Sequence, residues 1–312
     1  MSIGFCQFIG EEISIDQKTP LMPDLEVALF RTRYTAQDSK LKPDSPPWHK
    51  GFSFSNQTTE VIQTSVFINA ITFQLENERL DRDKSWHYLI NRNEIWELWK
   101  DEQGRFIFFN RLQPLLRQLT VDADFTKGLL VGNFLEGDRG VCYPLPQDLE
   151  IVFYVNWLGK LGDLVLHASG IAVDGKGYAF AGSSGVGKST LARKLNKNEN
   201  VTMLGEDQLV LRFLDNRFWI FGTPWHEDPL LCSPIGVPLE KIYFLEKNGT
   251  NAKIPVTPME GVTRLLQTAF IPYYRPEVVS RILEKLDILA ESVAMCKLSY
   301  SLDGDVEKLI FA

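Results

Sequence analysis

Residues 178–195, YAFAGSSGVGKSTLARKL, contain a segment of the form G-x-x-x-x-G-K-[ST]. An apolar strand is predicted before this segment and an amphipathic helix after it, which is the order that a phosphate-binding loop requires. Glycines let backbone N–H groups turn toward phosphate oxygens, and the positive end of the helix points at the same place. We therefore predict that a nucleoside triphosphate or a similar polyphosphate binds here. The predicted binding residues are Gly182, Ser183, Ser184, Gly185, Val186, Gly187, Lys188, Ser189 and Thr190.

Two side chains of this loop have predicted roles of their own. Lys188 is expected to reach the β- and γ-phosphates of ATP, and the Ser189 hydroxyl is expected to ligate Mg²⁺. Mg²⁺ needs a further oxygen ligand, usually an acid at the end of a neighbouring strand. Glu206 and Asp207 follow the apolar run VTML and offer that acid. Adjacent carboxylates can divide the work between metal and proton, with Asp207 as the metal ligand, although a solvated acidic turn has the same pattern.

A histidine lies on the strand that precedes the loop strand. His167 occurs in LHASG, and the turn DGKG at 174–177 predicts a hairpin between this strand and the loop strand. The hairpin brings His167 toward the phosphate site, where an imidazole could contact phosphate or take part in proton transfer. A packed histidine that is hydrogen-bonded to a neighbour is the alternative interpretation.

Taken together, these residues resemble a known family. LHASG, a short hairpin, GSSGVGKST and an acidic pair are similar to the HPr kinase/phosphorylase family and to a looser set of HPr-kinase-like proteins. The later run FGTPWHEDPLLCSPIGVPLEKIYFL resembles the looser set, some of which belong to gene clusters for ribosomally made, modified peptides and phosphorylate a peptide serine. The resemblance covers residues 150–312, whereas ELWKDEQGRFIF resembles the N-terminal half of that set only loosely.

The resemblance implies a P-loop serine kinase with the fold shared by HPr kinase and phosphoenolpyruvate carboxykinase. It places nucleotide and Mg²⁺ on Lys188 and Ser189, and the family histidine on His167. The family's first acid, which takes the proton of the acceptor hydroxyl, is usually Asp, but this chain has Glu206. Either Glu206 serves as the base, or Asp207 performs both tasks.

One signature of the true HPr kinases is absent. Their glycine-rich run beginning Arg-Gly-Leu-Gly is missing, and the segment 222–227 lies where it is expected. This difference argues against HPr as the substrate and against the reverse phosphorylase reaction. Trp225, His226 and Glu227 are therefore candidates for contacts with the acceptor or with phosphate, and an aromatic loop packed on the domain is the alternative.

The pattern of elements predicts two domains. Residues 1–145 are expected to be mostly β, with a strand at 25–30, a long loop at 38–59, a hairpin at 97–109 and a turn cluster at 135–148. Residues 146–312 are expected to form an α/β domain of the HPr kinase/phosphoenolpyruvate carboxykinase type, because strands and helices interleave there. The predicted helices are 149–161, 189–197, 258–270 and 276–293, and the predicted strands include 164–173, 177–182, 241–247 and 296–302.

Composition and charge limit the partners and the cellular compartment that we expect for this chain. The formal net charge is −7, and no basic stripe runs along the sequence, so no nucleic-acid partner is expected. The four cysteines are scattered, which favours reduced thiols, and the first residues do not resemble a signal peptide. The most apolar long window is interrupted by Lys160, Asp163 and His167, which argues against a membrane span. A cytoplasmic protein is the expectation.

Three functional hypotheses follow. The first is a kinase that transfers the γ-phosphoryl group of ATP to a serine or similar hydroxyl on a peptide or protein. The second is a kinase for a small-molecule hydroxyl, and the third is a non-catalytic nucleotide-binding protein that recruits partners. A GTPase is disfavoured because the chain has no Asn-Lys-x-Asp motif.

Overall fold

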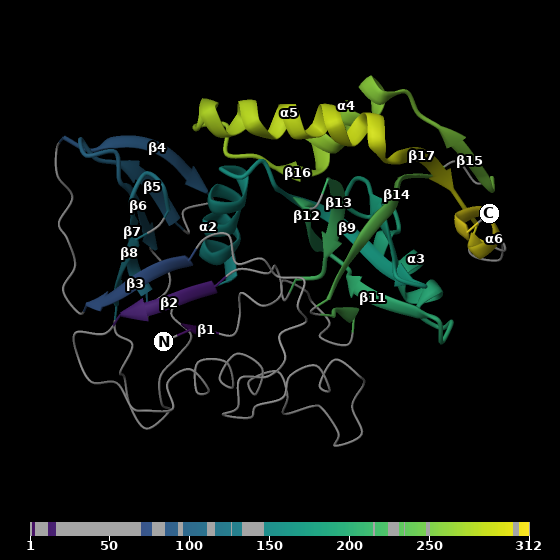
Figure 1. Ribbon diagram of the computed structural model, residues 1–312, viewed down its shortest axis with the longest axis horizontal. Helices are drawn as coiled ribbons and strands as arrows, with labels where there is room; N and C mark the ends of the chain where they lie inside the picture. The colour runs from purple at the N-terminus through teal and green to yellow at the C-terminus, as the bar shows by residue number, and fades with distance from the viewer. Residues whose placement is uncertain are drawn as a thin grey trace, which may run out of the picture. The chain divides into compact units, whose positions relative to one another are not determined.

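Two sheets and the helices that cover one of them make up the described part of the chain (Figure 1). The structure is a computed structural model, and contact clustering divides the chain into two units, Met1–Phe153 and Tyr154–Ala312. The predicted domain boundary after residue 145 stays a prediction. So do the roles expected of the two domains, recognition of the acceptor or partner by residues 1–145 and catalysis by residues 146–312. The predicted strand at 25–30 and loop at 38–59 lie outside the described residues. The structure describes residues 2–3, 12–16, 70–76, 85–92, 96–110, 116–125, 127–132, 147–214, 216–223, 231–233, 235–247, 250–301 and 306–311.

The first unit is built on a β-sheet. Its strands run in the order β1-β2-β3-β8-β7-β6-β5-β4. The strands from β4 to β8 form an antiparallel meander, whereas β2, β3 and β8 pair in parallel. The bounds are β1 (Ser2–Ile3), β2 (Glu12–Asp16), β3 (Ala70–Glu76), β4 (His87–Arg92), β5 (Trp96–Lys100), β6 (Phe106–Asn110), β7 (Leu116–Val121) and β8 (Lys127–Gly132).

The predicted hairpin at 97–109 is confirmed as β5 and β6. Its turn is closed by Asp101, whose buried carboxylate accepts the backbone N–H of Arg105 at 2.8 Å and the Nε–H of the same residue at 2.6 Å. Gly104 has a φ of 80°, which is the left-handed conformation that favours glycine. The sequence DEQG therefore specifies this turn through one carboxylate and one glycine.

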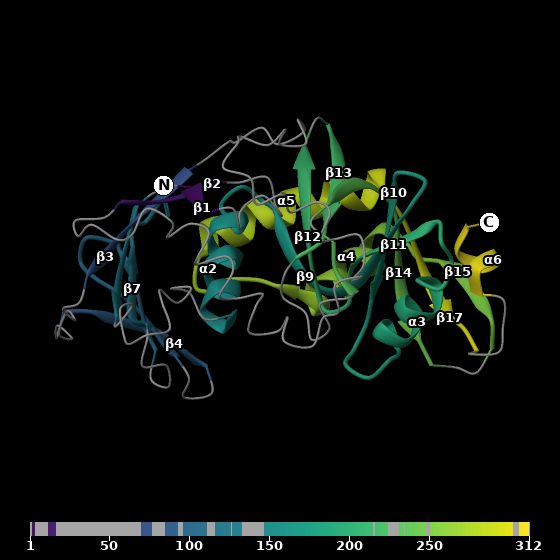
Figure 2. The ribbon, with the colours of Figure 1, turned by 90° about the horizontal axis from the view of Figure 1, so that it is seen from below.

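The second unit interleaves strands and helices, so the predicted α/β class is confirmed for it. Five strands pair in a closed circuit, β10-β9-β12-β13-β14 and back to β10, and β14 also pairs with β17 in parallel (Figure 2). The division between the units falls within α2 (Gln147–Gly159). The other bounds are β9 (Leu164–Val173), β10 (Lys176–Ala181), α3 (Lys188–Leu195), β11 (Val201–Gly205), β12 (Gln208–Leu214), β13 (Arg217–Phe221), β14 (Gly236–Glu246), β15 (Ala252–Pro255), α4 (Pro258–Thr268), β16 (Ala269–Phe270), α5 (Pro276–Ser292), β17 (Ala294–Ser299) and α6 (Val306–Phe311).

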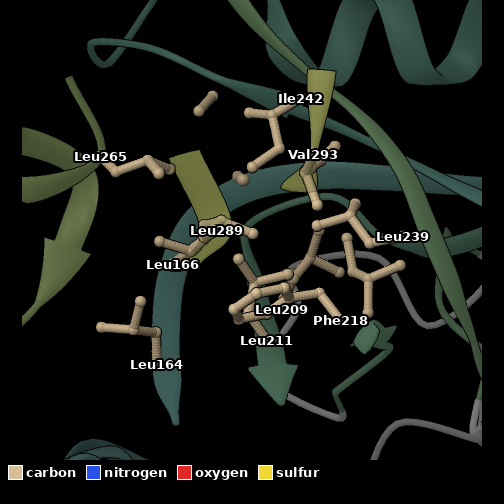
Figure 3. Close-up of a cluster of buried hydrophobic side chains, with 14 of the residues drawn as sticks. Leu164, Leu166, Leu209, Leu211, Phe218, Leu239, Ile242, Leu265, Leu289 and Val293 are labelled. Atoms are coloured by element: carbon tan, nitrogen blue, oxygen red, sulfur yellow. The ribbon is translucent and has the colours of Figure 1, made fainter. Parts of the chain in front are cut away.

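Side chains alternate between two cores along these strands, as the period of a β-strand requires. On one face, residues such as Leu164 and Leu166 of β9 pack with β12, β13, α4 and α5 (Figure 3). On the other face, Ile171 of β9 and Phe180 of β10 pack with α3 and α6. Because the side chains of His167 and Leu166 point to opposite faces, the sheet presents His167 on the side of α3, which is the helix that follows the glycine-rich segment.

Local signals in the sequence explain several element ends. The predicted 174–177 hairpin is confirmed, with Asp174 at φ 50° and Gly175 at φ 75° between paired strands β9 and β10. Thr257 caps α4 by accepting the backbone N–H of Glu260, and Pro258 follows at the first helical position. The helix predicted for 258–270 ends at Thr268, because the next two residues pair with β9 as β16.

A buried ion pair connects the start of this unit with its sheet. Arg212 Nε lies 2.8 Å from Asp163 Oδ2, and both side chains are almost fully buried. The other carboxylate oxygen of Asp163 accepts the backbone N–H of Phe213 at 3.2 Å.

Among the described helices, none combines the length and apolar character needed to cross a membrane.

Candidate active site

The glycine-rich loop, residues 182–189, leaves the end of β10 and enters α3 directly. Three of its glycines have positive φ, at 156° for Gly182, 74° for Gly185 and 113° for Gly187. A Cβ atom on Gly182 would lie 2.9 Å from the Val186 side chain, so the loop is closely folded at its start. Ser183, Ser184 and Gly185 are exposed at its tip. The backbone is therefore held at both ends and open to solvent between them.

Lys188 lies inside this loop. Its side chain is buried, and Nζ donates to the backbone carbonyls of Gly182 at 3.0 Å and Ser183 at 3.2 Å. An ammonium group has three N–H donors, and these bonds use two of them. Burial lowers the pKa of Lys188, and the negative charge of Asp207 opposes that shift. The ammonium group thus lies within the electrostatic reach of the second acidic residue.

His167 and Asp207 contact each other directly. His167 Nδ1 lies 3.0 Å from Asp207 Oδ1, and about a third of each side chain is exposed, 33% and 36% respectively. The hydrogen bond with His167 is the main cause that lowers the pKa of Asp207, and the charge of Lys188 lowers it further. The backbone N–H of Ala168 also donates to the Asp207 carbonyl at 3.0 Å, which fixes the loop between β11 and β12 beside β9. The carboxylate is therefore held ionised, oriented and accessible.

Gln208 also contacts the Asp207 carboxylate, and the sequence analysis did not predict it as a site residue. Its Nε2 donates to Asp207 Oδ2 at 3.2 Å, so each oxygen of Asp207 contacts a different side chain. Gln208 is the residue opposite His167 in the pairing of β9 with β12, which places both side chains on one face of the sheet. Its Oε1 is buried without a hydrogen-bond partner in the described part of the chain. Only the strand register, once known, identifies this residue.

Glu206 points elsewhere. Its side chain is 3% exposed, and Oε2 lies 3.0 Å from Nη2 of Arg193 on α3, whose own side chain is 54% exposed. Its backbone carbonyl accepts the Ser169 hydroxyl at 2.6 Å. The two neighbouring acids therefore meet different partners, with Glu206 tied to the loop helix and Asp207 facing His167 and Gln208. Arg193 was not singled out in the sequence.

Asp207 and Ser189, the two predicted Mg²⁺ ligands, both carry oxygen donors of the kind that Mg²⁺ takes. About a third of the Asp207 side chain is exposed, and Ser189 is half-buried in the first turn of α3, next to Lys188. The described residues contain no group of three or more His, Cys, Asp or Glu side chains placed to hold a metal. One carboxylate and one hydroxyl fit the way proteins bind Mg²⁺, which keeps several waters and takes phosphate oxygens as ligands.

Of the remaining predicted site residues, the structure describes Thr190 and Val186 but not Trp225, His226 and Glu227. Thr190 is exposed in the first turn of α3, and Val186 is half-buried against the core beneath that helix. Trp225, His226 and Glu227 lie outside the described residues, so their predicted contacts with acceptor or phosphate stay predictions.

Comparisons with known proteins add little to this picture. No protein-family model and no curated protein matches the chain. Among solved structures, the chain is similar to the Hpr(Ser) kinase/phosphatase from Coxiella burnetii, with a TM-score of 0.27 and 12% sequence identity. The match covers 47% of this chain and 85% of the other. Similarity at this level does not establish a shared fold, and the predicted relationship to the HPr kinases stays a prediction.

Proposed function

We propose that this chain is an ATP- and Mg²⁺-dependent phosphotransferase whose acceptor is a serine or similar hydroxyl on a peptide or protein. One arrangement carries the proposal: Lys188 Nζ is held inside the glycine-rich loop by the carbonyls of Gly182 and Ser183, and the partly exposed Asp207 carboxylate is held by His167 at 3.0 Å. Phosphoryl transfer depends on such a cation and carboxylate, the first at the phosphates and the second at the acceptor hydroxyl.

The loop residues would bind the nucleotide. Backbone N–H groups of residues 182–189 would contact the phosphate oxygens, and Lys188 would neutralise charge on the β- and γ-phosphates. Ser189 and Asp207 would hold Mg²⁺, which supplies further charge neutralisation when it is bound. Because phosphoryl transfer has a loose transition state, positioning and electrostatics account for most of the catalysis.

Asp207 is the residue we assign to the acceptor hydroxyl, in addition to the metal. The oxygen of the acceptor attacks the γ-phosphorus, the bond from that phosphorus to the β,γ-bridging oxygen breaks, and ADP leaves. The hydroxyl proton passes to the Asp207 carboxylate. Glu206 is less suited to this task, because its carboxylate is buried and paired with Arg193.

Mass spectrometry tests the proposal. The protein is incubated with ATP, Mg²⁺ and the serine-containing peptides encoded beside its gene, and each peptide is examined for the addition of one phosphate. Transfer that is lost in Lys188→Ala and kept in Lys197→Ala, which changes an exposed lysine just after α3, supports the peptide kinase. Tight binding of Mg·ATP without transfer to any peptide would overturn the choice of acceptor. A small-molecule kinase or a nucleotide-dependent recruiter would then be the better account.

A further inference from the structure

A tyrosine from the C-terminal part of the chain touches the last glycine of the loop. The hydroxyl of Tyr300, the residue after β17, donates to the backbone carbonyl of Gly187 at 2.9 Å. The same carbonyl accepts the N–H of Leu191 at 2.9 Å, which is the first backbone hydrogen bond of α3. Gly187 precedes this helix without any side-chain cap. The end of the loop is therefore supported from outside by Tyr300.

The fit between Tyr300 and Gly187 is close. A Cβ atom at Gly187 would lie 2.9 Å from the Tyr300 hydroxyl oxygen, and the φ of Gly187 is 113°. The backbone conformation of Gly187 favours glycine, and the Tyr300 hydroxyl lies close to where a Cβ atom would stand.

Tyr300 is itself held in place. Its ring packs against the core shared by α3 and α6, and the backbone N–H of the next residue, Ser301, donates to Asn251 Oδ1 at 2.6 Å. The α6 side of this core is held in turn, because the Tyr243 hydroxyl donates to the carbonyl of Ile310 on α6 at 2.7 Å. The Tyr300 ring and the backbone after it therefore both have fixed contacts.

We propose that Tyr300 is a positioning residue of the nucleotide site, an inference that rests on the proposed function. The peptide group between Gly187 and Lys188 is planar and trans, so its carbonyl and its N–H point in opposite directions. Holding the Gly187 carbonyl therefore fixes the direction of the Lys188 N–H. That N–H belongs to the set of backbone donors that surround the phosphates in loops of this kind. Tyr300 acts through the loop and does not touch the nucleotide.

Two tyrosine variants of the full chain separate positioning from stability. Tyr300→Phe removes the hydroxyl over Gly187, and Tyr243→Phe removes an equivalent hydroxyl whose acceptor is on α6. Each variant loses one neutral hydrogen bond, so a comparable loss of thermal stability is expected. Isothermal titration calorimetry with Mg·ATP is expected to show about threefold to tenfold weaker binding for Tyr300→Phe and wild-type affinity for Tyr243→Phe.

Steady-state kinetics give a second readout. The KM for ATP should rise in Tyr300→Phe while kcat changes little, because the Lys188 N–H binds the phosphates before and during transfer. Wild-type affinity in Tyr300→Phe, or an equal loss in both variants, would overturn the inference and leave the proposed function intact. A wild-type chain that does not bind Mg·ATP would instead overturn the proposed function, and the inference with it.

Discussion

The two neighbouring acids should respond to substitution in opposite ways. Glu206→Gln keeps the size of a buried side chain but removes the charge that meets Arg193. Because Arg193 is 54% exposed, its guanidinium regains water, and the cost should stay near that of an ordinary hydrogen bond, about 1 kcal/mol. For a unit the size of Tyr154–Ala312 this corresponds to a lowering of Tm by about 2–4 °C. The transfer rate should stay within about threefold of the wild type, since we assign Glu206 no contact with the reacting atoms.

Asp207→Asn should show the reverse. Asparagine keeps an oxygen that can accept from His167, so the Tm should change by less than in Glu206→Gln. It cannot take the acceptor proton and binds Mg²⁺ less well, so the rate should fall by about 10²–10⁴-fold. The assay is the initial rate at saturating Mg·ATP with the acceptor identified by mass spectrometry, paired with thermal unfolding of each variant. A rate loss in Glu206→Gln as large as that in Asp207→Asn would refute the assignment of roles.

Three further predictions concern supporting residues. Asp163→Ala leaves the Arg212 charge buried, so it should destabilise the second unit by about 3–5 kcal/mol in chemical denaturation. A double variant, Asp163→Leu with Arg212→Met, should recover most of that loss. If it does not, the ion-pair explanation is contradicted. Gln208→Leu removes one contact to Asp207 together with a buried oxygen that has no hydrogen-bond partner among the described residues, so it should slow transfer about 10- to 100-fold at unchanged affinity for ATP. An unchanged rate would show that His167 alone orients the carboxylate. Gly175→Ala forces alanine to adopt a φ of 75° in an open turn, and should cost about 1–2 kcal/mol in thermal unfolding without weakening ATP binding.

Predictions from the sequence succeeded where neighbours along the chain determine the outcome. The turn at Asp174 and Gly175 needs positive φ at both residues, and the two residues themselves provide it. The predicted start of a helix at Pro258 is local in the same sense, and the structure adds the cap at Thr257. The sequence also predicted the strand–loop–helix order around Lys188 and the hairpin that places His167 on a strand beside it.

The residues missed are those whose partners are distant or depend on register. Gln208 became significant only through its place opposite His167, and a shift of one residue would have turned it to the other face. Arg193 was one charge among several on α3 until the structure placed Glu206 beneath it. Tyr300 lies 113 residues from Gly187, and no periodic pattern connects the two. The helix α6, only six residues long, was too short for its periodicity to be recognised.

The long separation between Gly187 and Tyr300 has a consequence for biosynthesis. At ordinary translation rates the ribosome needs roughly 6–23 s to proceed from Gly187 to Tyr300, because the two residues are 113 positions apart in the sequence. During that interval β10 has its hairpin partner β9, but β14 and β17 are still being made. The nascent chain therefore carries the glycine-rich loop well before it has the Tyr300 hydroxyl that contacts Gly187.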